Sequence, residues 1–146
     1  MKLRFLSLAA PAVVLALVAC GGGSEVCPPD WNQSSDSPGD CAPPSSFVTQ
    51  TTASIGSGVY GFMRTNAQGS GDQLVVGAKV FALPSTSTSC DAASVNEVGQ
   101  AVTDDNGIYT MQLPAGDYFI TSGEIPVCTA VHVDANTISD VALTSD

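Results

Sequence analysis

The chain carries two kinds of apolar pattern. One continuous apolar run, Phe5–Val18, stands near the start, whereas short runs with alternating apolar residues follow from about Ile55. Alternation of period two is typical of strands, because successive side chains then point to opposite faces of a sheet. The alternating runs predict seven strands, at Val59–Arg64, Val75–Leu83, Gln100–Thr103, Gly107–Leu113, Asp117–Ser122, Cys128–Val133 and Ser139–Leu143. Many short strands separated by turn residues predict an all-β, antiparallel β-sandwich.

No segment carries a sustained helical period. The longest connection between predicted strands, Pro84–Gly99, is rich in Ser and Thr, and we expect one short helical turn there, around Ala92–Asn96. Residues 21–54 combine a Gly-Gly-Gly-Ser start with several Pro pairs and show no period at all, which is typical of a linker. We therefore predict a disordered tether before the sandwich.

Two tight turns stand out between predicted strands. Asp104-Asp105-Asn106-Gly107 is typical of a hairpin turn, because Asp and Asn tolerate a left-handed backbone and Gly adopts positive φ without steric cost. Leu113-Pro114-Ala115-Gly116 is a second turn of the same kind. We expect Gly107 to have positive φ. The oxygens of Asp104, Asp105 and Asn106 could also face a calcium ion, but the spaced acids of a calcium loop are missing, so we predict no metal site.

These two hairpins resemble those of carboxypeptidase regulatory-like domains, which share a transthyretin-like (prealbumin-like) β-sandwich. Val59-Tyr60-Gly61-Phe62-Met63 and Val76-Gly77-Ala78-Lys79-Val80 are similar to the first and second strands of that family. The resemblance covers about residues 56–143. It implies a seven-stranded sandwich that acts as an accessory or binding module, and the wider class includes starch-binding-like modules.

The tetrapeptide Leu17-Val18-Ala19-Cys20 resembles the lipobox of bacterial lipoproteins. That resemblance implies removal of residues 1–19 and lipidation of Cys20. The 14-residue run before it is shorter than the ~20 apolar residues of a spanning helix, although an ordinary signal peptide remains the alternative. In the lipoproteins that this sequence resembles, an aspartate directly after the cysteine favours retention in the inner membrane. This chain has Gly21 at that position, so the resemblance implies the outer membrane. The predicted division is a signal peptide at 1–19, a lipidated tether at 20–54 and a β-sandwich domain at 55–146.

Four cysteines remain after Cys20, an even number that favours disulfides in an exported protein. Four cysteines allow three pairings, and proximity favours Cys27 with Cys41 and Cys90 with Cys128. A zinc site is the alternative, but the chain has no C-x-x-C pair and a single histidine, His132.

Charge and chemistry narrow the function further. Without residues 1–19, Arg64 and Lys79 are the remaining strong bases against 14 acids, a formal charge of 2 − 14 = −12, which argues against nucleic acid as a partner. His132 stands alone between two valines, and neither a metal pair of the H-x-x-E type nor a G-x-S-x-G elbow occurs. We expect a non-enzyme without a cofactor.

Strand alternation also predicts an outward aromatic patch, made of Tyr60, Phe62, Phe81 and Phe119, with Leu83 beside it. Alternatively, the tether or the Pro84–Gly99 connection covers these side chains. The sequence thus predicts a lipid-anchored, cell-envelope module that binds an unknown protein or glycan or has a structural role. A carbohydrate-binding module is the first alternative, and an enzyme of unrecognised type is the second.

Overall fold

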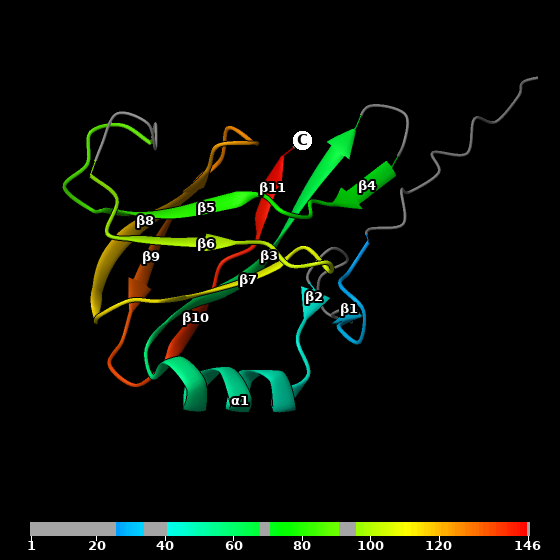
Figure 1. Cartoon of the computed structure of the whole chain (residues 1–146), viewed down its shortest axis with the longest axis horizontal. Coiled ribbons are helices and arrows are strands. Elements are labelled where there is room, and N and C mark those ends of the chain that lie inside the picture. Colours follow the sequence, from blue (N-terminus) through cyan, green and yellow to red (C-terminus); the bar gives the residue numbers. More distant parts are fainter. Residues whose placement is uncertain (1–25, 34–40, 68–70, 91–95, 146) are drawn as a thin grey trace, which may run out of the picture.

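Two β-sheets pack face to face in the computed structural model, which describes residues 26–33, 41–67, 71–90 and 96–145 (Figure 1). The first sheet contains β3 (Gly58–Ala67), β4 (Gly71–Leu74), β7 (Ile108–Gln112), β10 (Ile138–Asp140) and β11 (Leu143–Ser145). The second sheet has the order β6-β5-β8-β9 and contains β5 (Lys79–Pro84), β6 (Gly99–Val102), β8 (Gly116–Ser122) and β9 (Cys128–Val133). The fold is therefore the predicted β-sandwich.

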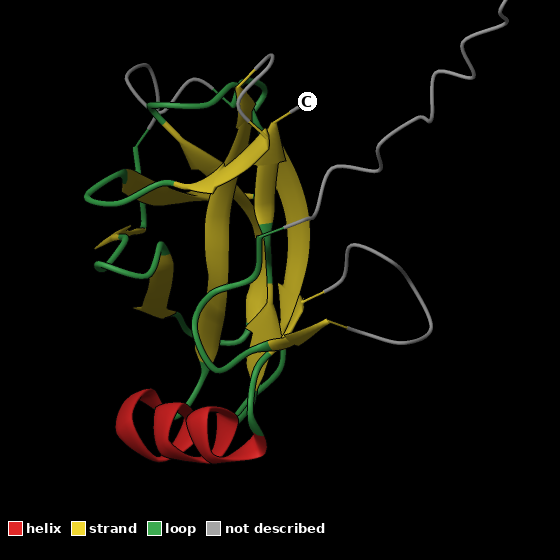
Figure 2. Ribbon diagram, turned by 90° about the vertical axis from the view of Figure 1, so that its right-hand side faces the viewer, coloured by secondary structure: helices red, strands yellow, loops and turns green. Residues whose placement is uncertain are grey.

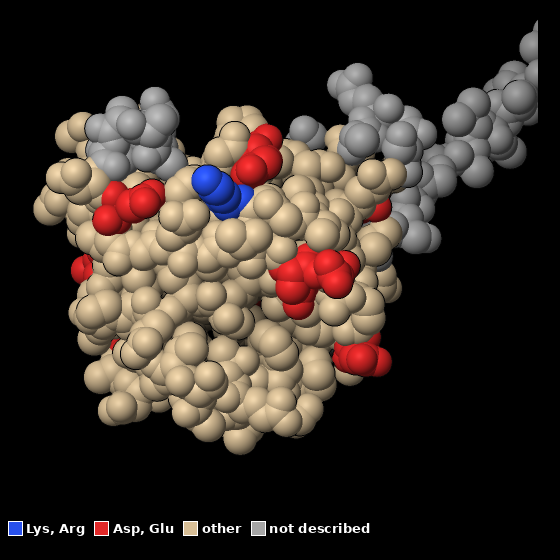
Figure 3. Space-filling model, viewed as in Figure 1, with Lys and Arg blue, Asp and Glu red and all other residues tan. Residues whose placement is uncertain are grey.

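The main core lies between the sheets and follows the predicted alternation. Val59 and Met63 of β3, Val80 of β5, Ile120 of β8 and Val133 of β9 are each 0% exposed. Burial of apolar side chains stabilises a fold by roughly 25 cal/mol per Å² of apolar surface, so this layer is the main source of stability. Acidic side chains on the face in Figure 3 form separate groups, as expected of a solvated surface.

The last predicted strand is corrected by the structure. Ser139–Leu143 is not one antiparallel strand, because β10 and β11 are separate and both pair with β3 in parallel, so the sheet is mixed. Between them, Val141 donates its N–H to the Tyr60 carbonyl, and its own carbonyl accepts the hydroxyl of Tyr109. This side-chain bond replaces a ladder bond at Val141, which interrupts the strand.

The predicted second strand begins later than expected. β5 starts at Lys79, because Gly77 has a φ of 73° and leaves the extended conformation. The separate strand β4 precedes it and pairs with the end of β3. The helical turn expected around Ala92–Asn96 lies almost entirely outside the described residues.

The N-terminal segment contains regular structure that the sequence did not predict. Strands β1 (Asn32–Gln33) and β2 (Cys41–Ala42) form a small hairpin, and helix α1 (Ser45–Ile55) follows. Figure 2 shows α1 lying across one end of the sandwich. The expectation of a disordered tether is therefore wrong for these residues, whereas the domain boundary at 54/55 stays a prediction.

Helix α1 was missed because its apolar stripe is short. Phe47, Val48, Thr51 and Ile55 recur with helical spacing, but hydroxyl residues fill the positions between them. The helix ends at Gly56, whose positive φ of 75° favours glycine and whose N–H still donates to the Thr52 carbonyl. No helix in the described part of the chain is long and apolar enough to cross a membrane.

Candidate functional site

Both disulfides have the pairing that proximity favours. Cys27 is bonded to Cys41, with a Cα–Cα distance of 5.6 Å, and Cys90 is bonded to Cys128, with a Cα–Cα distance of 5.9 Å. Such bridges form and persist in oxidising compartments, which agrees with an exported protein. The first bridge closes the β1–β2 hairpin, and the second ties the connection after β5 to the start of β9.

Tyr60 and Phe62 are not part of an exposed patch. They do point away from the main core, as alternation predicts, but Tyr60 is 7% exposed and Phe62 is 2% exposed. The N-terminal segment covers them: the ring centroid of Trp31 lies 6.0 Å from that of Tyr60 and 5.5 Å from that of Phe62. The alternative, in which the tether covers these side chains, is the arrangement observed.

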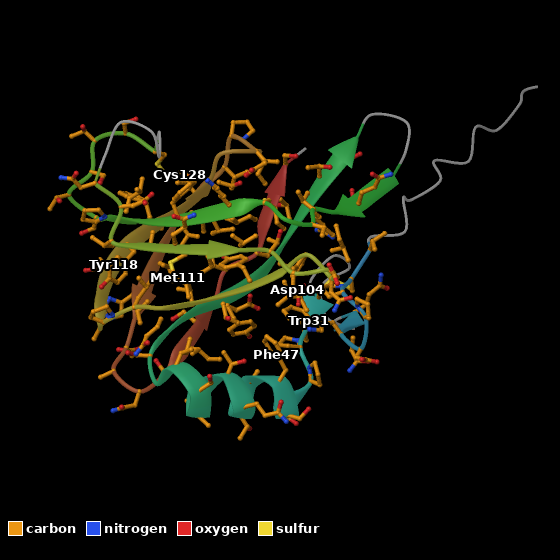
Figure 4. The ribbon with its side chains drawn as sticks, viewed as in Figure 1. Trp31, Phe47, Asp104, Met111, Tyr118 and Cys128 are labelled. Atoms are coloured by element: carbon orange, nitrogen blue, oxygen red, sulfur yellow. A yellow bond between two sulfur atoms is a disulfide. The ribbon has the colours of Figure 1, made fainter. Side chains whose placement is uncertain are left out.

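We call Trp31, Phe47, Tyr60 and Phe62 the aromatic cluster. Phe47 of α1 completes it, with ring centroids 5.7 Å from Trp31 and 5.6 Å from Tyr60 (Figure 4). The tilted and edge-on geometries are those that aromatic pairs prefer, each worth about 0.5–1.5 kcal/mol beyond burial. The cluster is a second small core, and its rings are already occupied by each other, so it does not offer a binding surface.

Two buried tyrosine hydroxyls flank this region and act as structural donors. Burial, together with the nearby charge of Asp140 and a hydrogen bond to it, raises the pKa of Tyr60 to about 12. Burial, and then the charge of Asp140, also raises the pKa of Tyr109 well above its ordinary value. Both hydroxyls therefore keep their protons at neutral pH, and Tyr109 donates its proton to the Val141 carbonyl.

Phe81 and Phe119, the other half of the predicted patch, remain partly accessible on the outer face of the second sheet. Leu83, which was expected beside them, is instead fully buried. The chain after β5 lies beside this face, because Thr121 of β8 donates its hydroxyl to the Cys90 carbonyl at 3.2 Å. The predicted four-residue patch is thus reduced to two half-buried phenylalanines.

A shallow hollow of about 220 Å³ lies next to Phe119, and we call it the β8–β9 hollow. Its lining comes from the chain just after β5 and from β8 and β9: Ser85, Asp117, Tyr118, Phe119, Ala130, Val131 and His132. Figure 4 labels Tyr118 at this end of the sandwich. Apolar walls with a few polar groups are the usual composition of a ligand site.

Asp117 and His132 line the hollow, and Asp134, which lies outside the lining, completes an Asp–His–Asp arrangement. Asp117 and His132 are direct cross-strand partners, and their Oδ1 and Nδ1 atoms lie 2.6 Å apart. The other ring nitrogen, Nε2, lies 3.4 Å from Oδ1 of Asp134. The hydrogen bond to Asp117 and then the charge of Asp117 raise the pKa of His132. Desolvation opposes this shift, and the charge of Asp134 and a hydrogen bond to it add to it.

The ring of His132 is held between two carboxylates. Both nitrogens of His132 face carboxylates, and the ring is exposed at the surface. Within the described residues, no group of three His, Cys, Asp or Glu side chains is placed to hold a metal ion. The hollow offers hydroxyl and carboxylate hydrogen-bonding atoms beside the rings of Tyr118 and Phe119.

The turn at Asp104–Gly107 is confirmed, but it does not join a hairpin. β6 pairs with β5 and β7 pairs with β3, so this turn connects the two sheets, and the turn at Leu113–Gly116 between β7 and β8 does the same. Gly107 has a φ of 68°, and Oδ1 of Asp104 accepts the N–H groups of Asn106 at 2.8 Å and Ile108 at 2.9 Å. Asp104 therefore serves the backbone of the turn. Cys20, the predicted lipidation site, lies outside the described residues.

Comparison with known proteins gives distant structural neighbours. No family model and no curated protein matches the chain. A candidate carbohydrate-binding protein of Pseudomonas aeruginosa is similar with a TM-score of 0.47 and 20% identity, covering 68% of this chain and 96% of the other. The minor pilin of Streptococcus agalactiae is similar with a TM-score of 0.44 and 15% identity, covering 62% and 44%. The major pilin subunit of Bacillus cereus gives 0.38 and 18%, covering 60% and 29%.

Proposed function

We propose that the protein is a lipid-anchored, non-catalytic binding module of the cell envelope, which presents the β8–β9 hollow to its ligand. The Leu17–Cys20 sequence supports the anchor, and the two disulfides support an exported location. Gly21 supports the outer membrane as the place of attachment.

The observation that carries this proposal is the position of the hollow relative to the anchored end of the chain. In Figure 1 the first described segment, drawn in blue, lies on the right with β1, whereas β8 and β9 lie on the left. Residues 21–25 separate Cys20 from the described segment, and a fully extended chain of that length spans about 20 Å at most. Attachment at Cys20 would hold the sandwich close to the membrane with the hollow turned away from it.

A saccharide is the ligand class that the hollow suits best, so a carbohydrate-binding module is the specific form of the proposal. The ring of Phe119 offers a flat apolar surface, while Asp117 and Ser85 carry oxygens for hydroxyl groups. Tyr60 and Phe62, by contrast, cannot reach a sugar, because the aromatic cluster buries them.

A glycan array probed with the mature chain and with Phe119→Ala tests this proposal. We expect glycan binding that Phe119→Ala and Asp117→Asn abolish, while Thr110→Ala, at an exposed position on β7, leaves it unchanged. Circular dichroism should show all variants folded. Glycan binding that survives both hollow variants would place the ligand elsewhere. If no glycan binds but a protein ligand does, and Phe119→Ala abolishes its binding, the hollow is the binding site and its ligand is not a saccharide.

A further inference from the structure

Strand β6 forms one edge of the second sheet. The sheet order is β6-β5-β8-β9, and among the described strands only β5 pairs with β6. An edge strand presents backbone N–H and C=O groups that another chain can use, and natural proteins usually block such edges with Lys, Pro or inward charges. β6 has the sequence Gly99-Gln100-Ala101-Val102, which contains none of these.

The pairing register shows which backbone groups of β6 are open. Val80 is opposite Ala101 and Lys79 is opposite Val102, and Thr103 donates its N–H to the Ala78 carbonyl. In an antiparallel ladder every second residue exchanges both hydrogen bonds with its partner. Ala101 therefore bonds to β5, while Gln100 and Val102 direct their N–H and C=O groups away from the sheet.

Exposed apolar side chains line the same strand. Val98 is 52% exposed and Val102 is 54% exposed, on the face that Gln100 shares. Val76, 54% exposed, lies near the end of β6, because the next residue, Gly77, donates to the Thr103 carbonyl. These three are the most exposed large apolar residues in the described part of the chain. An added strand would cover apolar surface and satisfy open backbone groups together.

The neighbouring free edge, β7, is less suited to such an addition. Its first open residue, Ile108, already uses its N–H and C=O in the turn with Asp104. Its remaining outward side chains, Thr110 and Gln112, are polar and exposed. β6 is therefore the preferred edge, and β7 supplies a matched control.

The charges at the two ends of β6 select the occupant. Glu97 is exposed before the strand, and Asp104 and Asp105 are exposed after it. Figure 3 shows acidic groups on this face with one basic group between them, and Lys79 of β5 is the register partner of Val102. A second copy paired antiparallel, with Gln100 opposite Val102, would place Glu97 opposite Asp105 at both ends, and like charges directly opposite each other are destabilising. A partner strand with basic residues at both ends would place opposite charges against Glu97 and Asp105, so it pairs more favourably than a second copy in this register.

We propose that β6 binds an extended segment of a partner protein as an added antiparallel strand, with an apolar centre that covers the valines and basic residues at both ends. The edge lies apart from the β8–β9 hollow, across β5 in the sheet order, so this interaction is independent of ligand binding there.

A synthetic peptide with the sequence Lys-Lys-Thr-Val-Thr-Val-Thr-Lys-Lys, labelled for fluorescence polarisation, is the probe, and the full mature chain is the target. Gln100→Pro removes one open N–H without breaking a bond to β5, so it should weaken binding by about tenfold. Val102→Lys should weaken it similarly, because it adds a like charge against the peptide. Thr110→Pro on β7 should leave the affinity unchanged, as should Phe119→Ala in the hollow.

Thermal melts show whether each variant is folded. If Gln100→Pro does not fold, Val102→Lys still tests the proposal. Replacing the lysines of the probe with glutamates should abolish binding. Equal affinity of Val102→Lys and the unchanged protein would overturn the proposal, as would loss of binding in Thr110→Pro alone. Concentration-dependent dimerisation that Val102→Lys removes, measured by sedimentation, would identify a second copy as the occupant and also overturn it.

Discussion

Gly107 shows at the residue scale how one position fixes a turn. Its φ of 68° lies in the left-handed region, and the Asp104 side chain holds the adjacent N–H groups. A Cβ at this position would lie 3.0 Å from Cβ of Leu74 and 3.2 Å from the Met63 carbonyl oxygen. Both the backbone and the surroundings therefore require glycine.

Gly107→Val should destabilise the fold by about 1–3 kcal/mol, because a β-branched residue is strained at positive φ. Thermal melts measure the loss. Asp105→Ala is the matched control, since Asp105 is exposed in the same turn, and it should change the melting temperature little. A melting temperature of the unchanged protein that falls sharply with a chelator would instead reveal calcium at the turn.

His132 gives the second residue-scale prediction, which concerns pH. Its pKa is raised above 6.5 by Asp117 first and Asp134 second. A raised pKa in the folded state contributes stability below pH 6.5, and that contribution is lost as pH rises through the folded pKa. Because the pair is solvent-exposed, we expect a small effect. NMR titration of the ring protons should show the raised pKa, and Asp117→Asn should lower it. A pKa at or below 6.5 in the unchanged protein would contradict the geometry.

At the scale of elements, the N-terminal hairpin and helix α1 are held to the sandwich by the aromatic cluster. The Cys27–Cys41 bridge fixes the loop that carries Trp31, and Phe47 comes from the helix. The segment thereby covers the face of β3 that would otherwise expose Tyr60 and Phe62. Neither the hairpin nor the helix has a core of its own, so both depend on packing against β3.

Trp31→Ala should cost about 3–5 kcal/mol, the usual range for removing a buried tryptophan. Urea denaturation measures this change, and increased binding of an apolar dye should report exposure of Tyr60 and Phe62. Gln50→Ala, at an exposed position of α1, is the control and should behave like the unchanged protein. A loss below about 1 kcal/mol for Trp31→Ala would mean that the cluster does not hold the segment in place.

At the scale of the whole molecule, attachment and orientation depend on the N-terminus. Cys20 precedes the described segment by only a few residues, and the first disulfide begins at Cys27. A lipid on Cys20 would therefore act on the sandwich through the docked hairpin and not through a long free linker. The hollow and the β6 edge would then be presented by a body of restricted orientation.

Cys20→Ser should release the protein from membranes, because it removes the acyl chains that provide durable attachment. Detergent partitioning of cell fractions measures the release. Ser24→Ala, a nearby change that keeps Cys20, is the control and should stay membrane-bound. Membrane association that persists in Cys20→Ser would reject the lipid anchor.

The sequence by itself determined the local features of this protein. Alternation located β3, β7, β8 and β9 and the face on which Tyr60 and Phe62 lie, because side-chain direction in a strand depends only on residue number. The Asp104–Gly107 turn followed from the conformational preferences of Asp, Asn and Gly. The spacing of the cysteines favoured the disulfide pairing that the structure shows.

The tertiary structure decided what each surface meets. Phe47 holds helix α1 against Trp31 and Tyr60. The sequence of residues 45–55 has no strong helical period from which this helix could be predicted. Val141 interrupts the last strand because Tyr109, 32 positions away, bonds its carbonyl. Asp117 reaches His132 only through the β8–β9 register. These outcomes depend on contacts between distant residues, whose free energies local patterns do not contain, and for that reason the buried cluster and the open hollow became distinguishable only in the folded chain.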